Sequence, residues 1–161
     1  MTEDVVLRNV VETDLPIFFE FGSDPVALHM AAFTAKDPSN VEAFNDHWKR
    51  ILSDKNVITR TILLGEHVVG SLGSFVDEAF GKREVTYWIG REYWGRGFAT
   101  IALSRFLREL KARPIYARAS ADNIGSIRVL EKCGFKEFSR ARGFANARGK
   151  EIEEVILELT T

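Results

Sequence analysis

The stretch from residue 83 to residue 110 constrains the fold of this chain most, because its hydrophobic period changes once within it. Residues 84–89 are rich in β-branched and aromatic side chains, which is typical of a strand buried on both faces. From residue 98 onward the apolar side chains instead fall on one stripe at helical spacing. They are Phe98, Ala99, Ala102, Leu103, Phe106, Leu107 and Leu110. The stretch therefore predicts a strand, a short loop and a helix.

The loop between this strand and this helix contains Gly95 and Gly97. The first N–H groups of a helix lack intrahelical acceptors, and glycine lets a ligand approach them closely. A phosphate or pyrophosphate suits such a positive helix end best, and Arg91 and Arg96 add positive charge nearby. A tight turn without a ligand is the alternative, because two glycines separated by one residue are a weak motif.

Two familiar phosphate loops do not fit this stretch. Gly90 is followed five positions later by Gly95 and then by Arg96, so the G-x-x-x-x-G-K-[ST] motif is absent. No acidic nucleotide partner completes a G-x-G-x-x-G fingerprint either. A P-loop NTPase and a Rossmann dinucleotide domain are therefore poor interpretations.

Two sequence blocks resemble the GNAT superfamily of acetyl-CoA-dependent N-acetyltransferases, and most closely its RimJ/RimL-like branch. The first block is YWI at 87–89 with WGRGFAT at 94–100, and the second is N-x-x-S-x-R-V-L-E-K-x-G-F at 123–135. They cover the C-terminal half closely, whereas the N-terminal half agrees only in its order of elements. One residue departs from the pattern: Glu92 stands first in the Q/R-x-x-G-x-G/A loop, where a carboxylate cannot help to bind phosphate.

The order of elements predicts an α/β fold, an α+β mixed sheet in one domain spanning residues 1–161. The resemblance implies a mostly antiparallel sheet with helices on both faces and a V-shaped split after the strand at 84–89, where pantetheine inserts. It implies acetyl-CoA as cosubstrate, with the pyrophosphate on backbone N–H groups and the arginines. The expected contacts are Trp88, Ile89, Trp94, Gly95, Arg96, Gly97, Phe98, Ala99, Thr100, Asn123 and Ser126.

Charge and cysteine content exclude several classes of protein. The 161 residues carry 22 Lys and Arg against 23 Asp and Glu, a formal charge of −1, so nothing favours nucleic acid or an anionic membrane. A single cysteine, Cys133, excludes an internal disulfide, and its setting predicts packing. The three histidines and scattered carboxylates lack metal-ligand spacing, so we expect no metal. A cytoplasmic protein is the expectation.

The remaining elements are expected in a definite order. Asp14 or Thr13 caps a helix that runs to about Phe21, and residues 26–38 are ambiguous and loop-like. A capping box at 39–42 then begins a helix with a buried stripe, namely Val41, Phe44, Trp48, Ile51 and Leu52. The predicted strands are 5–8, 57–64, 68–76, 114–119, 138–144 and 152–159, and Asp122 or Asn123 caps a short helix.

Acyl transfer to an amine needs a base, because an alkyl amine with a pKa of about 10.4 must lose a proton before it attacks. It also needs a donor for the oxyanion. The resemblance points to the backbone N–H near Ile89 as that donor and to Glu84 as the base, acting directly or through water. The alternative is that Glu84 only begins the strand, partly exposed and paired with Arg83 or Lys82.

An acid for the departing thiolate is less evident. Many superfamily members have a tyrosine on the last helix where this chain has Leu130, and the RimJ/RimL-like branch offers a serine that matches Ser126. Ser126 either donates a proton or only hydrogen-bonds CoA or the helix backbone. Asn123 looks like a pantetheine or phosphate contact. His47 lies beside the predicted stripe, where a packed or half-exposed histidine is commoner than a base.

Two functions are compatible with these residues. The first is an N-acetyltransferase that moves acetyl to a primary amine, on a protein N-terminus or a small molecule, by direct attack in a ternary complex. The second is an inactive acyl-CoA-binding sensor or regulatory module. The region 29–48, which the family uses to wall the acceptor site, carries no motif that identifies the acceptor. The chain is expected to be a monomer, or a homodimer paired through its C-terminal strands.

Overall fold

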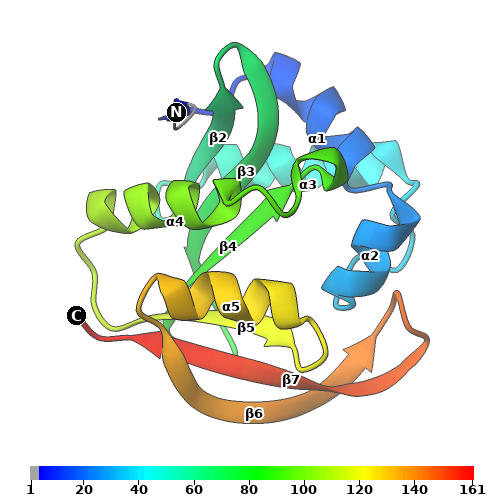
Figure 1. Cartoon of the computed structure of the whole chain (residues 1–161). Coiled ribbons are helices and arrows are strands. Elements are labelled where there is room, and N and C mark those ends of the chain that lie inside the picture. Colours follow the sequence, from blue (N-terminus) through cyan, green and yellow to red (C-terminus); the bar gives the residue numbers. More distant parts are fainter. Residues whose placement is uncertain (1–3) are drawn as a thin grey trace.

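The computed structural model describes residues 4–161, and its centre is one seven-stranded sheet with helices on both faces (Figure 1). The strand order is β1-β2-β3-β4-β5-β7-β6, and every neighbouring pair is antiparallel except β4 and β5. The strands are β1 Val5–Arg8, β2 Ile58–Leu64, β3 His67–Val76, β4 Arg83–Ile89, β5 Ile115–Ser120, β6 Lys136–Ala145 and β7 Lys150–Leu159. The predicted mixed, mostly antiparallel sheet is confirmed.

The helices follow the expected order with one addition. They are α1 Leu15–Phe21, α2 Pro25–Ala31, α3 Val41–Ser53, α4 Phe98–Glu109 and α5 Ile124–Lys132, with short 3-10 turns η1 Glu12–Asp14 and η2 Arg91–Tyr93. The added helix is α2, which lies in the segment expected to be loop-like. Its start has a clear cause, because the Asp24 carboxylate accepts hydrogen bonds from the N–H groups of Val26 at 2.8 Å and Ala27 at 3.3 Å.

Helix α3 differs from the prediction in two ways. Its cap is Asn40, whose side chain accepts a hydrogen bond from the Ala43 N–H at 3.0 Å, and Ser39 instead donates to Asp37. The predicted capping box starting at Ser39 is therefore wrong. The predicted buried stripe is wrong as well, since no residue of α3 is buried and Val41 and Leu52 are 47% and 42% exposed.

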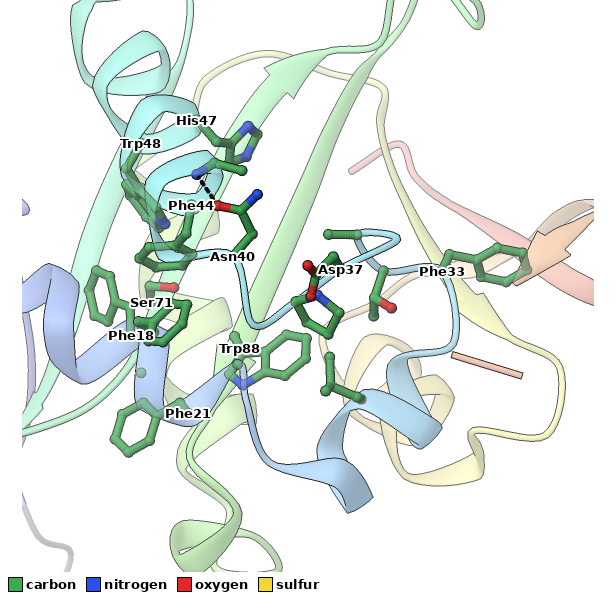
Figure 2. Close-up of a pocket in the computed structure, with 18 residues that line it drawn as sticks. Phe18, Phe21, Phe33, Asp37, Asn40, Phe44, His47, Trp48, Ser71 and Trp88 are labelled. Carbon is green, nitrogen blue, oxygen red and sulfur yellow. Dashed lines mark hydrogen bonds between the residues drawn. The ribbon is translucent and has the colours of Figure 1, made fainter. Parts of the chain in front are cut away.

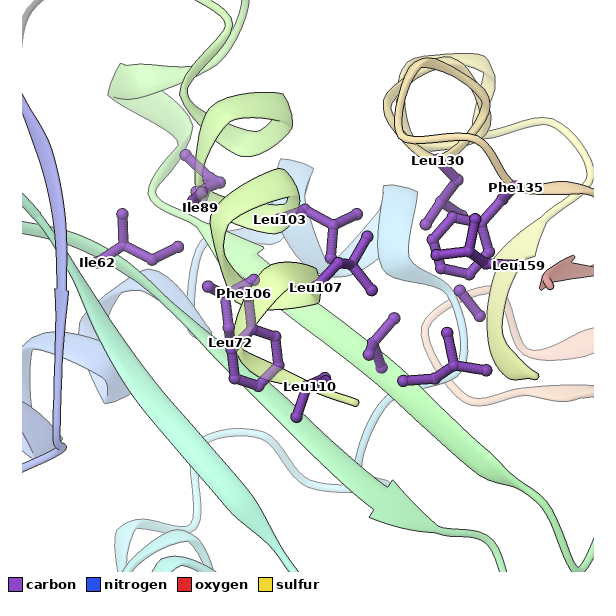
Figure 3. Close-up of a cluster of buried hydrophobic side chains, with 14 of the residues drawn as sticks. Ile62, Leu72, Ile89, Leu103, Phe106, Leu107, Leu110, Leu130, Phe135 and Leu159 are labelled. Carbon is purple, nitrogen blue, oxygen red and sulfur yellow. The ribbon is translucent and has the colours of Figure 1, made fainter. Parts of the chain in front are cut away.

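The core lies between the sheet and helices α4 and α5 (Figure 3). The predicted apolar stripe of α4 is confirmed in Phe98, Ala102, Leu103, Phe106, Leu107 and Leu110, all at most 5% exposed. These side chains meet Ile62, Leu72 and Ile89 of the sheet. Each fully buried side chain of this size contributes about 1.5–3 kcal/mol, so this packing fixes the start of α4 against the end of β4.

The sheet is split where β4 meets β5. These parallel strands pair at one position, Glu84 with Tyr116, whereas β3 and β4 pair along seven positions from Gly70 to Val76. Beyond Glu84 the two strands diverge toward their C-terminal ends (Figure 1). The expected V-shaped opening is therefore present, and helix α4 begins at its wide end.

Candidate active site

The loop after β4 leaves a helix end without a side-chain cap. Gly95 and Gly97 have φ angles of +74° and +80°, and Gly97 is the N-cap residue of α4 with no side-chain hydrogen bond to the helix. The first N–H group bonded back to the loop is that of Ile101, which donates to the Gly97 carbonyl at 3.2 Å. The N–H groups of residues 98–100 precede it and so lack intrahelical acceptors. This geometry can hold an anion.

Other side chains hold this loop in place. The Trp94 indole N–H donates to the Ile89 carbonyl at 2.8 Å, which ties the loop to the end of β4. The Arg96 guanidinium lies 4.8 Å from the centre of the Phe98 ring. Arg91 forms an ion pair with Asp24 at 2.8 Å, so its charge is engaged with the start of α2. The Arg91 side chain is 51% exposed, and its contact with a phosphate stays a prediction.

A pair of hydroxyl groups spans the split. Tyr87 on β4 and Ser126 on α5 lie 2.9 Å apart, oxygen to oxygen, and either hydroxyl can be the donor. Burial raises the pKa of Tyr87, and the hydrogen bond with Ser126 opposes that rise. Leu130 is buried one turn further along α5 and offers no proton. The sequence analysis missed Tyr87, although the alternation of β4 places it with Val85 and Ile89 on the face toward α4 and α5.

Asn123 organises the start of α5. Its side-chain oxygen accepts a hydrogen bond from the Ser126 N–H at 3.2 Å, and its amide nitrogen donates to the Met30 carbonyl at 3.2 Å. It thereby joins α5 to α2 at the opening. Of the two expected caps Asn123 is the one used, while Asp122 pairs with Arg148 at 2.8 Å.

Glu84 lies at the narrow end of the split. It is 4% exposed and forms an ion pair with Arg118 at 3.1 Å, and Arg118 also pairs with Glu154. The alternative in which Glu84 is partly exposed and paired with Arg83 or Lys82 is therefore wrong in both respects. Burial raises the pKa of Glu84, while the charge of Arg118 opposes this. Its role as the base stays a prediction.

A cavity of about 540 Å³ opens on the face of β4 that carries Trp88 (Figure 2). Glu84 projects to this same face, since it is four residues from Trp88 along the strand. The walls come from α1, the loop between α2 and α3, and α3, with β3 and β4 as the floor. Its aromatic residues are Phe18, Phe19, Phe21, Phe33, Phe44, Trp48 and Trp88.

The cavity has few polar groups. They come from Thr34, Asp37, Asn40, His47 and Ser71. Burial, with the nearby charge of Arg50, lowers the pKa of His47 below its ordinary value of 6.5. The segment 29–48, which was expected to wall an acceptor site, therefore supplies one whole side of the cavity.

The class of protein follows from comparison with known families. Residues 4–136 match the acetyltransferase (GNAT) domain. The chain therefore belongs to the GNAT family and is an acetyltransferase. Among the residues described, no helix is long and apolar enough to cross a membrane, and no group of three His, Cys, Asp or Glu could hold a metal ion.

Particular relatives agree with this assignment. The chain is 24% identical to a protein of Bacillus licheniformis named as an uncharacterized N-acetyltransferase, p20, over 98% of this chain and 93% of that one. The fold is similar to that of RimJ from Mycobacterium smegmatis in complex with CoA-disulfide. The TM-score is 0.82 at 21% identity, covering 98% of this chain and 82% of RimJ.

A second solved structure has the same fold. The acetyltransferase MccE, which confers self-immunity to microcin C7, is described in complex with acetyl-CoA and AMP. It has a TM-score of 0.81 to this chain at 14% identity, covering 99% of this chain and 94% of that one.

Proposed function

We propose that this chain transfers the acetyl group of acetyl-CoA to a primary amine by direct attack within a ternary complex. The observation that carries this proposal is the uncapped start of α4 beside the split between β4 and β5. A pyrophosphate on the N–H groups of residues 98–100 leaves the pantetheine arm free to enter the split. The cavity on the Trp88 face of β4 then gives room for the amine.

The reaction forms one bond and breaks one. The amine lone pair attacks the thioester carbonyl carbon, the C–N bond forms, and the C–S bond breaks as the thiolate leaves. The ammonium gives up one proton before it attacks, which we assign to Glu84, directly or through water. The nitrogen gives up a second proton as the C–S bond breaks, which balances the proton taken up by the thiolate. A raised pKa suits this role, because a base works best when its pKa lies closer to the working pH. A backbone N–H at the end of β4, near Ile89, is the proposed oxyanion donor.

The Tyr87–Ser126 pair is the proposed partner of the departing sulfur. A phenol with a raised pKa stays protonated at neutral pH, so Tyr87 is able to hold the Ser126 hydroxyl in place by donating to it. Ser126 then donates to the sulfur in the transition state, or contacts bound CoA without moving a proton.

The variant Ser126→Ala separates these two roles. If Ser126 donates in the transition state, kcat falls about 10-fold or more while acetyl-CoA affinity stays the same. If Ser126 is only a contact, acetyl-CoA affinity falls and kcat is unchanged. Calorimetric titration and steady-state kinetics on the same preparation measure both quantities.

Acetyl-CoA binding is the first test of the proposed function. Calorimetric titration with acetyl-CoA, with NAD and ATP as controls, measures the selectivity of the loop. Selective binding of acetyl-CoA, followed by thiol release with an amine, is the expected result. Absence of acetyl-CoA binding would remove the proposal and leave residues 94–100 as a structural turn.

A further inference from the structure

Helix α3 presents an apolar face that α1 covers only in part. Its sequence predicts a buried stripe, yet Phe44 and Trp48 are only half-buried and no residue of the helix is buried. Both side chains face the cavity instead of a packed core (Figure 2). An apolar face that remains open beside an active site is typical of a surface that a ligand covers.

The aromatic side chains in the wall of the cavity contact one another. The ring centroids of Phe18 and Trp48 lie 5.2 Å apart, those of Phe19 and Phe44 5.1 Å apart, and those of Phe44 and Trp48 6.4 Å apart. Each of these spacings is that of a favourable aromatic pair. These contacts join α1 and α3 in one aromatic wall, which is suited to a flat apolar group.

The cavity has one fixed charge. Asp37 is the only carboxylate among the cavity-lining residues, and no Lys or Arg lines it. The Asp37 side chain accepts hydrogen bonds from the Ser39 N–H at 3.1 Å and the Ser39 hydroxyl at 2.6 Å. Within residues 4–161, no cation forms an ion pair with it. A ligand with a single ammonium group would match the one negative charge on the cavity.

The floor carries an unpaired donor. The Trp88 indole N–H is buried and is the only such side-chain polar atom without a hydrogen-bond partner among the residues described. A buried donor without an acceptor costs about 1–3 kcal/mol, and a carbonyl of bound acetyl-CoA that reached it would remove this cost. Trp88 lies between the aromatic wall and Asp37 (Figure 2).

From these features we infer that the acceptor is a small primary monoamine with an aromatic body, of the arylalkylamine class. This inference rests on the proposed function and specifies its substrate. The aromatic body packs between Trp88 and the face of α3, and the ammonium group pairs with Asp37 before it is deprotonated. A cavity of about 540 Å³ is in the range of small-molecule sites.

Other amines fit this cavity less well. A polyamine brings several ammonium groups, and each one beyond the first would be desolvated against aromatic side chains without a carboxylate. A protein N-terminus brings peptide groups that need hydrogen-bond partners, whereas the cavity wall is mostly aromatic. Both amines serve as competing substrates in the test.

The test measures acetyl-CoA-dependent thiol release with 2-phenylethylamine, ethylamine, spermidine and a short peptide with a free N-terminus. Burial of a phenyl ring raises kcat/KM for 2-phenylethylamine about 100-fold over ethylamine. The kcat/KM for 2-phenylethylamine should also exceed the kcat/KM values for spermidine and for the peptide. A higher value for spermidine or for the peptide overturns the inference and leaves the proposed acetyl transfer intact. Failure to bind acetyl-CoA removes the proposed function itself.

Variants and a binding measurement keep the inference testable if turnover is slow. Trp48→Leu and Asp37→Asn should each raise KM for 2-phenylethylamine about 10-fold, while Leu52→Ala, on the same helix but outside the cavity, leaves KM unchanged. Unchanged acetyl-CoA affinity shows that the variants are folded. Titration of the acetyl-CoA-free protein with 2-phenylethylamine is the second readout, and absence of binding there, or an unchanged KM in both cavity variants, contradicts the assignment.

Discussion

The proposed pyrophosphate site can be tested by adding one Cβ atom, in the variants Gly97→Ala and Gly65→Ala. Both glycines have positive φ angles, +80° and +60°, and a Cβ atom at either position would meet nothing within 4 Å. Alanine therefore costs each site a similar amount, about 1 kcal/mol of backbone strain. Only Gly97 stands at the start of α4, next to the N–H groups that lack intrahelical acceptors.

We therefore expect Gly97→Ala to weaken acetyl-CoA binding about 10-fold or more and Gly65→Ala to leave it unchanged. Calorimetric titration measures the affinities, and thermal unfolding checks that the two variants lose similar stability. Equal affinities in the two variants would place the CoA pyrophosphate elsewhere.

Glu84 can be tested through the pH dependence of the reaction. A base acts in its ionised form, and burial raises the pKa of Glu84 above its ordinary value of 4.5. The acid limb of the kcat/KM profile should therefore lie above pH 4.5, with activity lost as pH falls through the raised pKa. In Glu84→Gln we expect kcat to fall about 10-fold or more, with a profile that rises toward the pKa of the free amine, about 10.4.

Arg83→Gln is the control for Glu84→Gln. Arg83 neighbours Glu84 on β4 but donates to Ser74 and not to the Glu84 carboxylate. The variant Arg83→Gln should keep the acid limb of the kcat/KM profile. If Glu84→Gln keeps both kcat and the acid limb, Glu84 serves only its ion pair with Arg118.

At the scale of the elements, we expect the N-cap residue of α5 to affect both the stability of the protein and its binding of acetyl-CoA. The N-caps Asn123 and Asn40 each accept one helix N–H, but Asn123 also donates to the Met30 carbonyl and lies three residues before Ser126. Asn123→Ala and Asn40→Ala should each lower the free energy of unfolding by about 1 kcal/mol. Only Asn123→Ala should also weaken acetyl-CoA binding, which titration of both variants would measure. If both variants bind acetyl-CoA equally well, Asn123 serves only as the N-cap of α5.

Local sequence patterns predicted some elements well and others poorly. The strand, loop and helix from Arg83 to Glu109 follow from a change of period that packing on the core then enforces. Helix α2 was missed, although Asp24 followed by Pro25 is a helix-start signal, because its seven residues give too short an apolar period. The stripe of α3 was wrongly expected to be buried. Phe44 and Trp48 line the cavity and Val41 and Leu52 are exposed, and periodicity does not distinguish these settings from a core.

The site required the three-dimensional structure for a similar reason. The glycines and the matched blocks pointed from the sequence to the candidate anion-binding loop, because its groups lie within a few residues of one another. The partners of Glu84 and Tyr87 could not be found that way. Arg118 and Ser126 are 34 and 39 residues distant from Glu84 and Tyr87. Only the folded chain brings these groups together.

At the scale of the whole molecule, one buried carboxylate joins the N-terminal segment to the sheet. Asp14 is 2% exposed and accepts hydrogen bonds from Arg8 at 2.7 Å and 2.9 Å, from the Thr61 hydroxyl at 2.6 Å and from the Val11 N–H at 3.0 Å. Burial acts to raise the pKa of Asp14, but these donors together hold it below its ordinary value of 3.8. The ionised form is therefore favoured in the folded protein.

This lowered pKa sets the sign of a stability prediction. A carboxyl whose pKa falls on folding stabilises the protein above its unfolded pKa, here 3.8, and this stabilisation is lost as pH falls through the folded pKa. Asp14→Asn should therefore lower the free energy of unfolding by about 2 kcal/mol at pH 7. The difference from the unaltered protein should shrink below pH 3.8, as urea unfolding at pH 7 and pH 3 would measure.

The matched control is Glu137→Gln, which removes an exposed carboxylate that pairs with Arg140. Solvent screens that pair, so its loss should leave the free energy of unfolding unchanged at both pH values. A pH-independent loss in Asp14→Asn would mean that the hydrogen-bond geometry of Asp14, and not its charge, joins β1 to η1 and β2. The N-terminal segment would then depend on the shape of this carboxyl group at every pH.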